Sequence, residues 1–178
     1  THSLSFLYKL NVIVNPSLSD DTKEVYFRHE LEILRHSTDS VGNVKFLTTL
    51  KLMAGLCTRQ GRYDEAKAYL REEFEAKRRV MGDDDLTTLI FNNAMGGLNH
   101  LEGKYHKAEY HYTEALEGFR RIIDGKYGFC KPHRVLAYAM PDSIWTINSL
   151  VKLYDDWDKP EEAQKYRDML PAQEEASP

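Results

Sequence analysis

The hexapeptide Gly61-Arg62-Tyr63-Asp64-Glu65-Ala66 returns 42 positions later as Gly103-Lys104-Tyr105-His106-Lys107-Ala108. A weaker third copy, Asp158-Lys159-Pro160-Glu161-Glu162-Ala163, follows after 55 positions, 13 more than the first interval. Self-similarity at a fixed period indicates a chain built from structural repeats. The longer second interval predicts an insertion at about residues 124–140.

Each copy of the hexapeptide joins two helical segments. The segment before the first copy carries apolar residues at i, i+3, i+4 and i+7, which form one helical stripe: Leu50, Met53, Ala54 and Cys57. Gly61 tolerates the positive φ at which such a helix stops. An amphipathic helix pair cannot bury its apolar face alone and needs a neighbouring pair. We expect helices over residues 3–14, 20–36, 44–60, 63–81, 86–101, 105–123, 143–156 and 160–170.

The sequence therefore predicts an all-α, right-handed superhelical solenoid of antiparallel helix pairs. Pro141-Asp142-Ser143 is expected to end the preceding segment and open the last pair, with the aspartate capping the N-terminus of the following helix. The apolar residues of the insertion predict a docked segment with extra helix around residues 132–139. The expected units are a divergent N-terminal helix pair (1–43), a repeat (44–85), a repeat with the insertion (86–141), a C-terminal repeat (142–170) and a polar tail (171–178).

Composition excludes several classes of protein. The 178 residues carry a formal net charge of −4, which argues against nucleic-acid binding driven by bulk charge. Two cysteines are too few for a disulfide framework and indicate a reducing, cytoplasmic setting. No apolar run reaches the ~18–20 residues of a membrane span. The N-terminus lacks both a signal peptide and an initiator methionine, so we expect a fragment of a longer protein.

No catalytic or metal-binding set is evident. His100, His106 and His111 are close in sequence, but the last two are five positions apart and lie about 140° apart on a helix. Cys57 lies on an apolar stripe and is expected to be buried. Cys130 lies beside Lys131 and His133, which leaves a lowered thiol pKa open without an acyl-transfer signature. We expect no enzymatic activity, no metal and no cofactor.

The repeated hexapeptide resembles the helix-turn-helix joint of a tetratricopeptide repeat. The 42-position period is similar to that of the kinesin-light-chain subtype rather than the ~34 residues of the ordinary repeat. Residues 141–150 resemble the inter-repeat segment of that subtype, and Asn92-Asn93 resembles its asparagine pair. The resemblance covers roughly residues 44–170 and implies a protein-interaction scaffold.

In tetratricopeptide arrays, the first helix of each pair lines a concave groove. By the repeat register, three successive rungs of that groove are expected to hold partner-binding residues. An asparagine amide there can clamp the backbone of an extended peptide whatever its sequence, whereas solvated polar residues are the alternative. Trp145 is expected in the core, with a groove anchor as the alternative. The predicted groove residues are Lys51, Thr58, Asn93, Gly97, His100, Asn148, Lys152 and Asp155.

We therefore expect a non-enzymatic scaffold or adaptor module that binds a protein or extended peptide, with neither nucleic acid nor membrane as partner. The first alternative is a self-association module, in which the apolar face of the terminal pair docks onto a second copy. The second alternative is a small helical enzyme or metal-binding protein that uses the histidines or Cys130. No acid, base and nucleophile set supports that second alternative.

Overall fold

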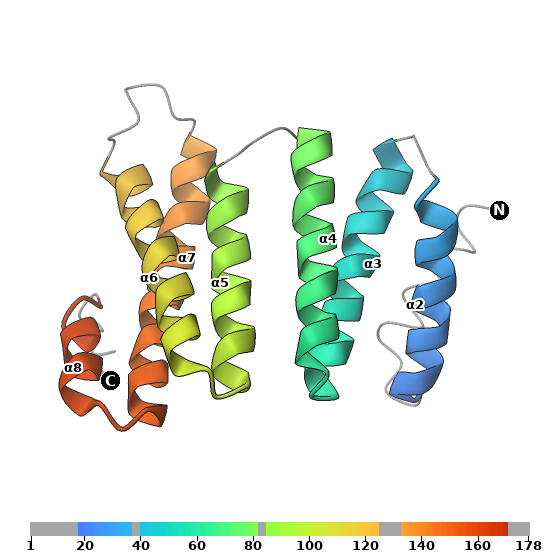
Figure 1. Ribbon diagram of the computed structural model, residues 1–178. Helices are drawn as coiled ribbons and strands as arrows, with labels where there is room; N and C mark the ends of the chain where they lie inside the picture. The colour runs from blue at the N-terminus through green and yellow to red at the C-terminus, as the bar shows by residue number, and fades with distance from the viewer. Residues whose placement is uncertain (1–17, 37–39, 82–84, 125–132, 171–178) are drawn as a thin grey trace, which may run out of the picture. The chain divides into compact units, whose positions relative to one another are not determined.

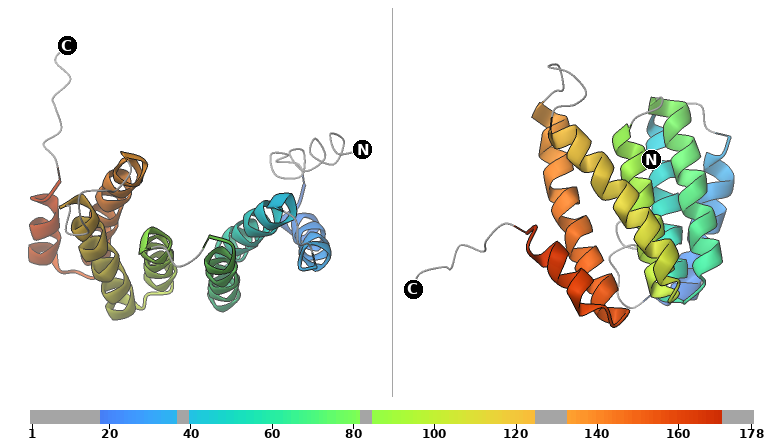
Figure 2. Two further views of the ribbon diagram at one scale, coloured as in Figure 1. Left: turned by 90° about the horizontal axis from the view of Figure 1, so that it is seen from above. Right: turned by 60° about the vertical axis from the view of Figure 1, so that its left-hand side comes forward.

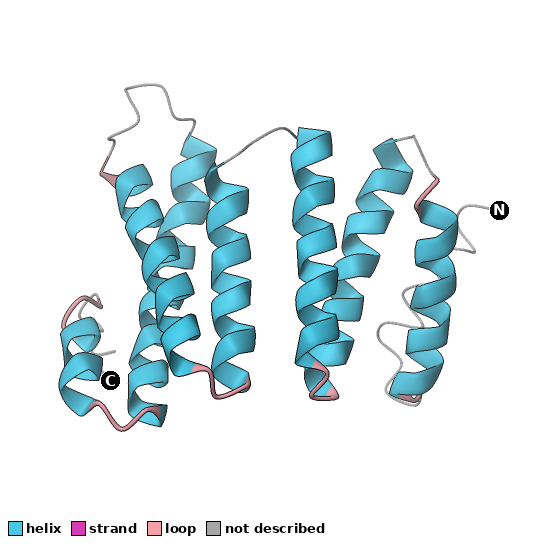
Figure 3. Cartoon of the chain, viewed as in Figure 1, coloured by secondary structure: helices cyan, strands magenta, loops and turns pink. Residues whose placement is uncertain are grey.

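The computed structural model describes residues 18–36, 40–81, 85–124 and 133–170. Every regular element of these ranges is an α-helix, and they contain no strand (Figures 1 and 3). The predicted helix at 3–14 and the tail at 171–178 lie outside the described residues. The helices are α2 (Asp20–Leu34), α3 (Ser40–Arg59), α4 (Tyr63–Met81), α5 (Asp85–Leu101), α6 (Tyr105–Ile123), α7 (His133–Asp156) and α8 (Pro160–Arg167).

The three copies of the hexapeptide form the same backbone joint. Gly61 and Gly103 have φ values of 73° and 74°, and Asp158 occupies the equivalent position with φ 57°. The residue after each of them donates its N–H to a carbonyl in the last turn of the preceding helix. These hydrogen bonds run from Arg62 to Cys57, from Lys104 to Asn99 and from Lys159 to Tyr154, at 2.9, 2.8 and 2.9 Å. Because the three joints coincide, the register read from the sequence describes the helix ends correctly.

The chain forms two compact units, residues 1–76 and 77–178, and α4 runs across the boundary. In the first unit, Ser19 caps α2 by accepting a hydrogen bond from the backbone N–H of Thr22 at 3.2 Å. The apolar stripe of α3 lies at the centre of this unit, and Cys57 within it is fully buried, as predicted. The core residues are Phe27, Leu31, Phe46, Leu47, Leu50, Met53, Leu56 and Ala76.

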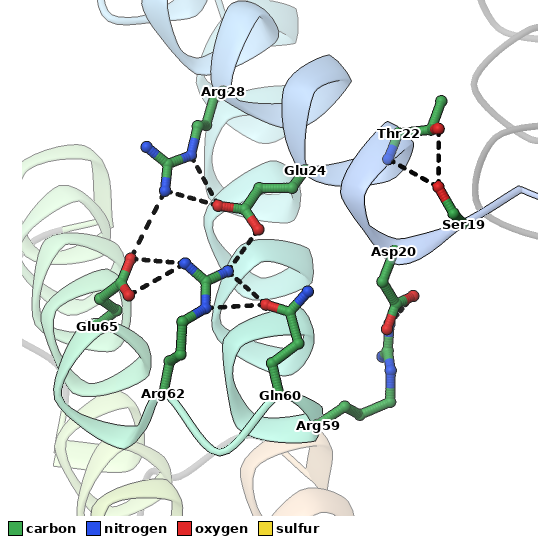
Figure 4. A network of polar contacts seen from close by, with 9 residues as sticks. All are labelled: Ser19, Asp20, Thr22, Glu24, Arg28, Arg59, Gln60, Arg62 and Glu65. Atoms are coloured by element: carbon green, nitrogen blue, oxygen red, sulfur yellow. Dashed lines mark hydrogen bonds and ion pairs between the residues drawn. The ribbon is translucent and has the colours of Figure 1, made fainter.

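A polar network ties α2 to the joint between α3 and α4 (Figure 4). Arg62 donates to Glu24 at 2.5 Å, to both carboxylate oxygens of Glu65 at 3.0 Å and to Gln60 at 2.9 Å. Arg28 donates to Glu24 from the next turn of α2, at 2.6 Å. Burial opposes ionisation of Glu24, but the hydrogen bonds from the two arginines outweigh it and lower the pKa of the carboxyl.

In the second unit, α7 contacts α5, α6 and α8 (Figure 2). Glycines let α5 and α6 approach closely. A Cβ on Gly96 would lie 2.7 Å from the ring of Tyr112, and one on Gly118 would lie 2.1 Å from Leu89. Gly96 and Gly118 therefore allow a close approach that a larger residue would block. The core residues of this unit are Leu89, Ala108, Tyr112, Ala115, Leu116, Phe119, Ile122, Ile147, Leu150, Leu153, Tyr154 and Ala163.

The predicted start of the last pair at Pro141 is wrong. Helix α7 begins at His133, eight residues earlier, and continues through Pro141. A proline inside a helix costs one hydrogen bond to the fourth preceding carbonyl but has a helical φ, so a helix-compatible segment before it can continue. The extra helix expected around residues 132–139 is confirmed from His133 onward. The rest of the insertion, residues 125–132, lies outside the described residues.

Aromatic rings join the ends of α6, α7 and α8. Trp157 stacks on Tyr105 and Tyr154 with ring centroids 5.7 and 6.1 Å apart, and Tyr154 stacks on Tyr166 at 5.5 Å. The ammonium of Lys159 lies 3.4 Å from the centroid of the Trp157 ring. These contacts hold the third joint, where the usual glycine and tyrosine are absent.

Candidate functional site

The predicted groove residues divide between the two units. In the first unit, Lys51 on α3 is exposed, and the Thr58 hydroxyl donates to the Ala54 carbonyl at 2.7 Å. The other six lie on α5 and α7 of the second unit. These two helices run parallel, and positions 55 residues apart are equivalent in the repeat register (Figure 1). Each of these residues on α5 therefore has an equivalent on α7.

Two apolar side chains at equivalent positions are exposed. Ile90 on α5 is 40% exposed, and Trp145 on α7 is 51% exposed. Gly97 and Lys152 form the next equivalent pair on the same helix faces, and Lys152 is exposed. We call this surface the α5–α7 face; its residues are Ile90, Gly97, Leu101, Trp145 and Lys152.

Tyr112 of α6 forms the floor of this face. A Cβ on Gly97 would lie 3.5 Å from the Tyr112 hydroxyl, and the Tyr112 and Trp145 rings make an edge contact with centroids 6.3 Å apart. The Tyr112 side chain is buried, and burial raises the pKa of its hydroxyl to about 12, against a smaller opposing effect of a hydrogen bond with Ser149. A neutral, rigid ring thus supports the exposed indole.

Two predicted groove residues are largely buried between helices, so the structure does not place them on an open surface. Asn93 is only 6% exposed and accepts a hydrogen bond from Thr146 Oγ1 at 2.9 Å. His100 lies 2.9 Å from the Asp156 carboxylate through Nε2, and its side chain is 12% exposed. Both lie on the flank of α5 that α7 covers, so they join helices instead of facing outward.

The equivalents of these two residues on α7 remain accessible. Asn148 is exposed and donates from its amide nitrogen to the Ile144 carbonyl at 3.1 Å. Asp155 is exposed and accepts from Arg167 of α8, with both carboxylate oxygens at 2.6 Å. They lie on the flank of α7 that corresponds to the covered flank of α5. Of the predicted set in this unit, only Gly97 and Lys152 belong to the α5–α7 face.

Sequence reasoning missed three residues of this site and misplaced a fourth. Trp145 was expected in the core, but it is 51% exposed, and within the described ranges only the edge contact with Tyr112 joins its ring to a buried aromatic residue. Ile90 could have been found as the residue 55 positions before Trp145. Tyr112 and Leu101 carried no comparable signal, since their placement depends on packing between helices.

A pocket lies on the opposite side of α5, between α5 and α6. This pocket has a volume of about 160 Å³. Gly118 and Leu89, which lie against each other, are among its lining residues. Thr88 and Asn92 of this pocket each lie about 160° from Ile90 around α5, so the two surfaces are distinct. The lining residues are Thr88, Leu89, Asn92, Glu114, Gly118, Arg121 and Ile122.

The described residues contain no cluster of three or more histidine, cysteine or acidic side chains that could hold a metal ion. Burial raises the pKa of the Cys57 thiol, which makes it a poor nucleophile. Cys130 and Lys131 lie outside the described residues, as does the His133 side chain. Among the helices described, none is long and apolar enough to cross a membrane.

Comparison with known proteins supports the repeat assignment. Residues 46–121 match the family model described as a tetratricopeptide repeat. The crystal structure of BtubC (BKLC) from P. vanneervenii is similar over 97% of this chain and 64% of that chain, with a TM-score of 0.56 and 19% sequence identity. The match thus covers less than two thirds of that chain's length, and the likeness concerns the fold alone. No curated protein matches the chain. The fold is all-α and tetratricopeptide-repeat-like, and its repeat signature lies in residues 46–121.

Proposed function

We propose that this chain is a protein-interaction module that binds an extended peptide on the α5–α7 face. Tetratricopeptide repeats generally mediate protein–protein interaction. The observation that carries the proposal is the exposure of Ile90 and Trp145 at equivalent positions of neighbouring parallel helices. Large apolar side chains that face water together are typical of interaction sites, and tryptophan is enriched among the residues that dominate binding energy.

The polar residues of the face fit a peptide ligand. Lys152 lies about two turns beyond Trp145 on α7, at a distance along the axis of about 10 Å. It forms no ion pair with another described residue and is therefore available to a carboxylate or carbonyl of the ligand. Gly97 leaves room beside it for a backbone to approach. The site has no nucleophile with an activating base, so the proposal is a binding role without catalysis.

The proposed parent is a larger cytoplasmic adaptor or scaffold with repeats of the kinesin-light-chain-like subtype. The 42-residue interval between the first two joints supports that subtype, because the backbone hydrogen bonds of the joints recur at the same interval as the sequence motif. The right-handed superhelical arrangement of the helix pairs and the boundaries of the repeats stay predictions.

Selection of binders from a random peptide library, displayed on phage, tests this function. Peptides selected on the wild-type chain are expected to lose at least tenfold in affinity on Trp145→Ala. Tyr110→Ala is the matched control, since Tyr110 is also a large exposed aromatic residue but lies on α6. Selected peptides that bind Trp145→Ala and the wild type equally would refute the site.

The same variants test self-association. Light scattering should give a monomer mass over the concentration range of the peptide assay. A concentration-dependent dimer that Trp145→Ala converts to monomer would assign the face to a second copy of this chain instead of a peptide.

A further inference from the structure

Helix α7 is held on α5 by two polar contacts that are ten residues apart on α7. Thr146 donates to the amide oxygen of Asn93 at 2.9 Å, and Asp156 lies 2.9 Å from His100 Nε2. Ten residues of helix span about 15 Å, so these contacts fix both ends of the interface between the two helices. A wrong register of α7 on α5 would leave the buried Asn93 unpaired, which is costly.

In the first unit, α3 makes contacts from the same two repeat positions. Thr49 donates to a carboxylate oxygen of Glu30 on α2 at 2.8 Å, and Arg59 donates to Asp20 at 3.2 Å. Thr49 and Thr146 are 97 positions apart in the sequence, as are Arg59 and Asp156, so each pair is equivalent in the repeat register. A hydroxyl followed ten residues later by a charged group is thus used twice to attach a helix to one that precedes it.

The flank of α7 that corresponds to the covered flank of α5 carries residues at the same two repeat positions as Asn93 and His100. Asn148 and Asp155 are the equivalents of Asn93 and His100, but both are exposed. Since the Asn148 amide nitrogen bonds to the Ile144 carbonyl, its carbonyl oxygen has no donor among the described residues. The Asp155 carboxylate is paired with Arg167 and has lone pairs for a second donor. Ile144 lies beside them and is partly exposed.

We propose that this flank, formed by Ile144, Asn148 and Asp155, binds an α-helix of a partner protein that carries Ser or Thr and, ten residues later, Lys or Arg. The hydroxyl would donate to Asn148 as Thr146 donates to Asn93. The Lys or Arg is required because Asp155 is an acidic residue at the repeat position of His100. His100 contacts the acidic Asp156, whereas Asp155 needs a basic partner. A second copy of this chain does not supply the helix, since its Thr49 and Arg59 are already bonded to α2. The flank is separate from the α5–α7 face.

A synthetic peptide with the sequence of residues 141–158 and the replacement Asp156→Arg is the probe. It presents the threonine and the base ten residues apart, on a helix whose shape already fits an equivalent surface. Calorimetric titration into the full chain is expected to give saturable binding. Asn148→Ala in the chain, or Thr146→Ala in the peptide, should each weaken it about threefold to tenfold, the effect of one lost hydrogen bond. The two changes together should cost little more than either alone.

Charge reversal distinguishes this flank from the covered side of α5. The unmodified peptide, with Asp156, should bind the wild-type chain more weakly than the Asp156→Arg peptide and should bind an Asp155→Arg chain better. If the peptide instead displaced α7 from α5, the wild-type chain would prefer the unmodified peptide, because its Asp156 is the natural partner of His100. Tyr110→Ala in the chain, on the exposed surface of α6, is the control and should leave the affinity unchanged.

Three results would overturn the inference. The first is that the Asp156→Arg peptide shows no saturable binding up to about 1 mM, a concentration that corresponds to a weak specific affinity. The second is that this peptide binds the Asn148→Ala chain and the wild-type chain with equal affinity. The third is that the wild-type chain prefers the unmodified peptide. Circular dichroism of each variant would establish that the chain remains folded. None of these results depends on whether a peptide binds the α5–α7 face.

Discussion

Asn93 and Thr146 form a buried hydrogen bond between α5 and α7, with 2.9 Å between the amide and hydroxyl oxygens. Thr146 also donates to the Asp142 carbonyl at 2.7 Å, so its hydroxyl is shared between its own helix and the neighbour. Asn148 is the repeat equivalent of Asn93 and is exposed. The same residue type at the same repeat position therefore stabilises the fold in one helix and remains accessible in the next.

Asn93→Ala is expected to lower the free energy of unfolding by about 1–3 kcal/mol, because it removes a buried acceptor and leaves a small void. Asn148→Ala, the chemically identical change, should stay within about 0.5 kcal/mol of the wild type. Urea denaturation followed by circular dichroism would measure both. Equal destabilisation by the two substitutions would contradict the assignment of Asn93 to the interface between the helices.

Gly96→Ala is expected to destabilise the second unit by about 1–3 kcal/mol, since the added Cβ would lie 2.7 Å from a buried aromatic ring. Gly55→Ala is the matched control in α3, where nothing lies within 4 Å of the added Cβ. Alanine there should stabilise the helix by about 0.5–1 kcal/mol. Thermal melts of the two variants should shift in opposite directions. A Gly96→Ala variant as stable as wild type would show that α5 and α6 are farther apart than described.

The sequence was sufficient for the fold because each repeat carries local signals. The period, the apolar stripe of α3 and the positive-φ position of each joint are all properties of short segments, and even Asp158 kept the joint geometry without glycine. The start of α7 was missed because a proline is a weak boundary when the residues before it also favour helix.

The site was only partly predictable, because it depends on which flank of each inner helix its neighbour covers. The repeat register placed Asn93 and Gly97 in one predicted groove, although they differ by about 40° around α5. Helix α7 buries Asn93 and leaves Gly97 partly exposed, and Asn148, the equivalent of Asn93 on α7 itself, is exposed. Only the packing of α7 on α5 separates the two roles.

Ala108→Leu is expected to destabilise the chain by about 1–3 kcal/mol. Ala108 is fully buried in the core that α6 shares with α7, and the added carbons have no free volume to occupy. Ala68→Leu on the exposed side of α4 is the control and should be nearly neutral. A melting temperature unaffected by Ala108→Leu would mean that the repeat register is wrong at the second joint.

Stability is expected to fall between about pH 10 and pH 12 through Tyr112. Its pKa is raised to about 12 in the folded chain, mainly by burial, whereas an unfolded tyrosine ionises near pH 10. Above pH 10 the unfolded chain releases this proton and the folded chain retains it, which favours unfolding. The contribution of Tyr112 to the free energy of unfolding is fully present below about pH 10. At pH 12 the free energy of unfolding is lower by at most about 3 kcal/mol.

Tyr112→Phe tests this assignment because phenylalanine cannot ionise. The difference in unfolding free energy between Tyr112→Phe and wild type should be constant from pH 7 to pH 9 and should shift in favour of Phe above pH 10. Urea titrations at closely spaced pH values would measure it. A difference that is independent of pH up to 11.5 would exclude a raised pKa at Tyr112.

Asp158→Gly is expected to stabilise the third joint by about 1 kcal/mol. Asp158 has a φ of 57°, a conformation that costs a residue with a Cβ about 1–2 kcal/mol and costs glycine almost nothing. Its backbone N–H donates to the Asp155 carbonyl at 3.2 Å, and glycine retains that bond. Gly103→Ala is the reciprocal control at the equivalent position of the second joint, with φ 74°, and it should destabilise by a similar amount. Both effects should appear in the melting temperature, with opposite signs. If Asp158→Gly were neutral or destabilising while Gly103→Ala lowered the melting temperature, the Asp158 carboxylate would have to make a stabilising contact that offsets the backbone strain.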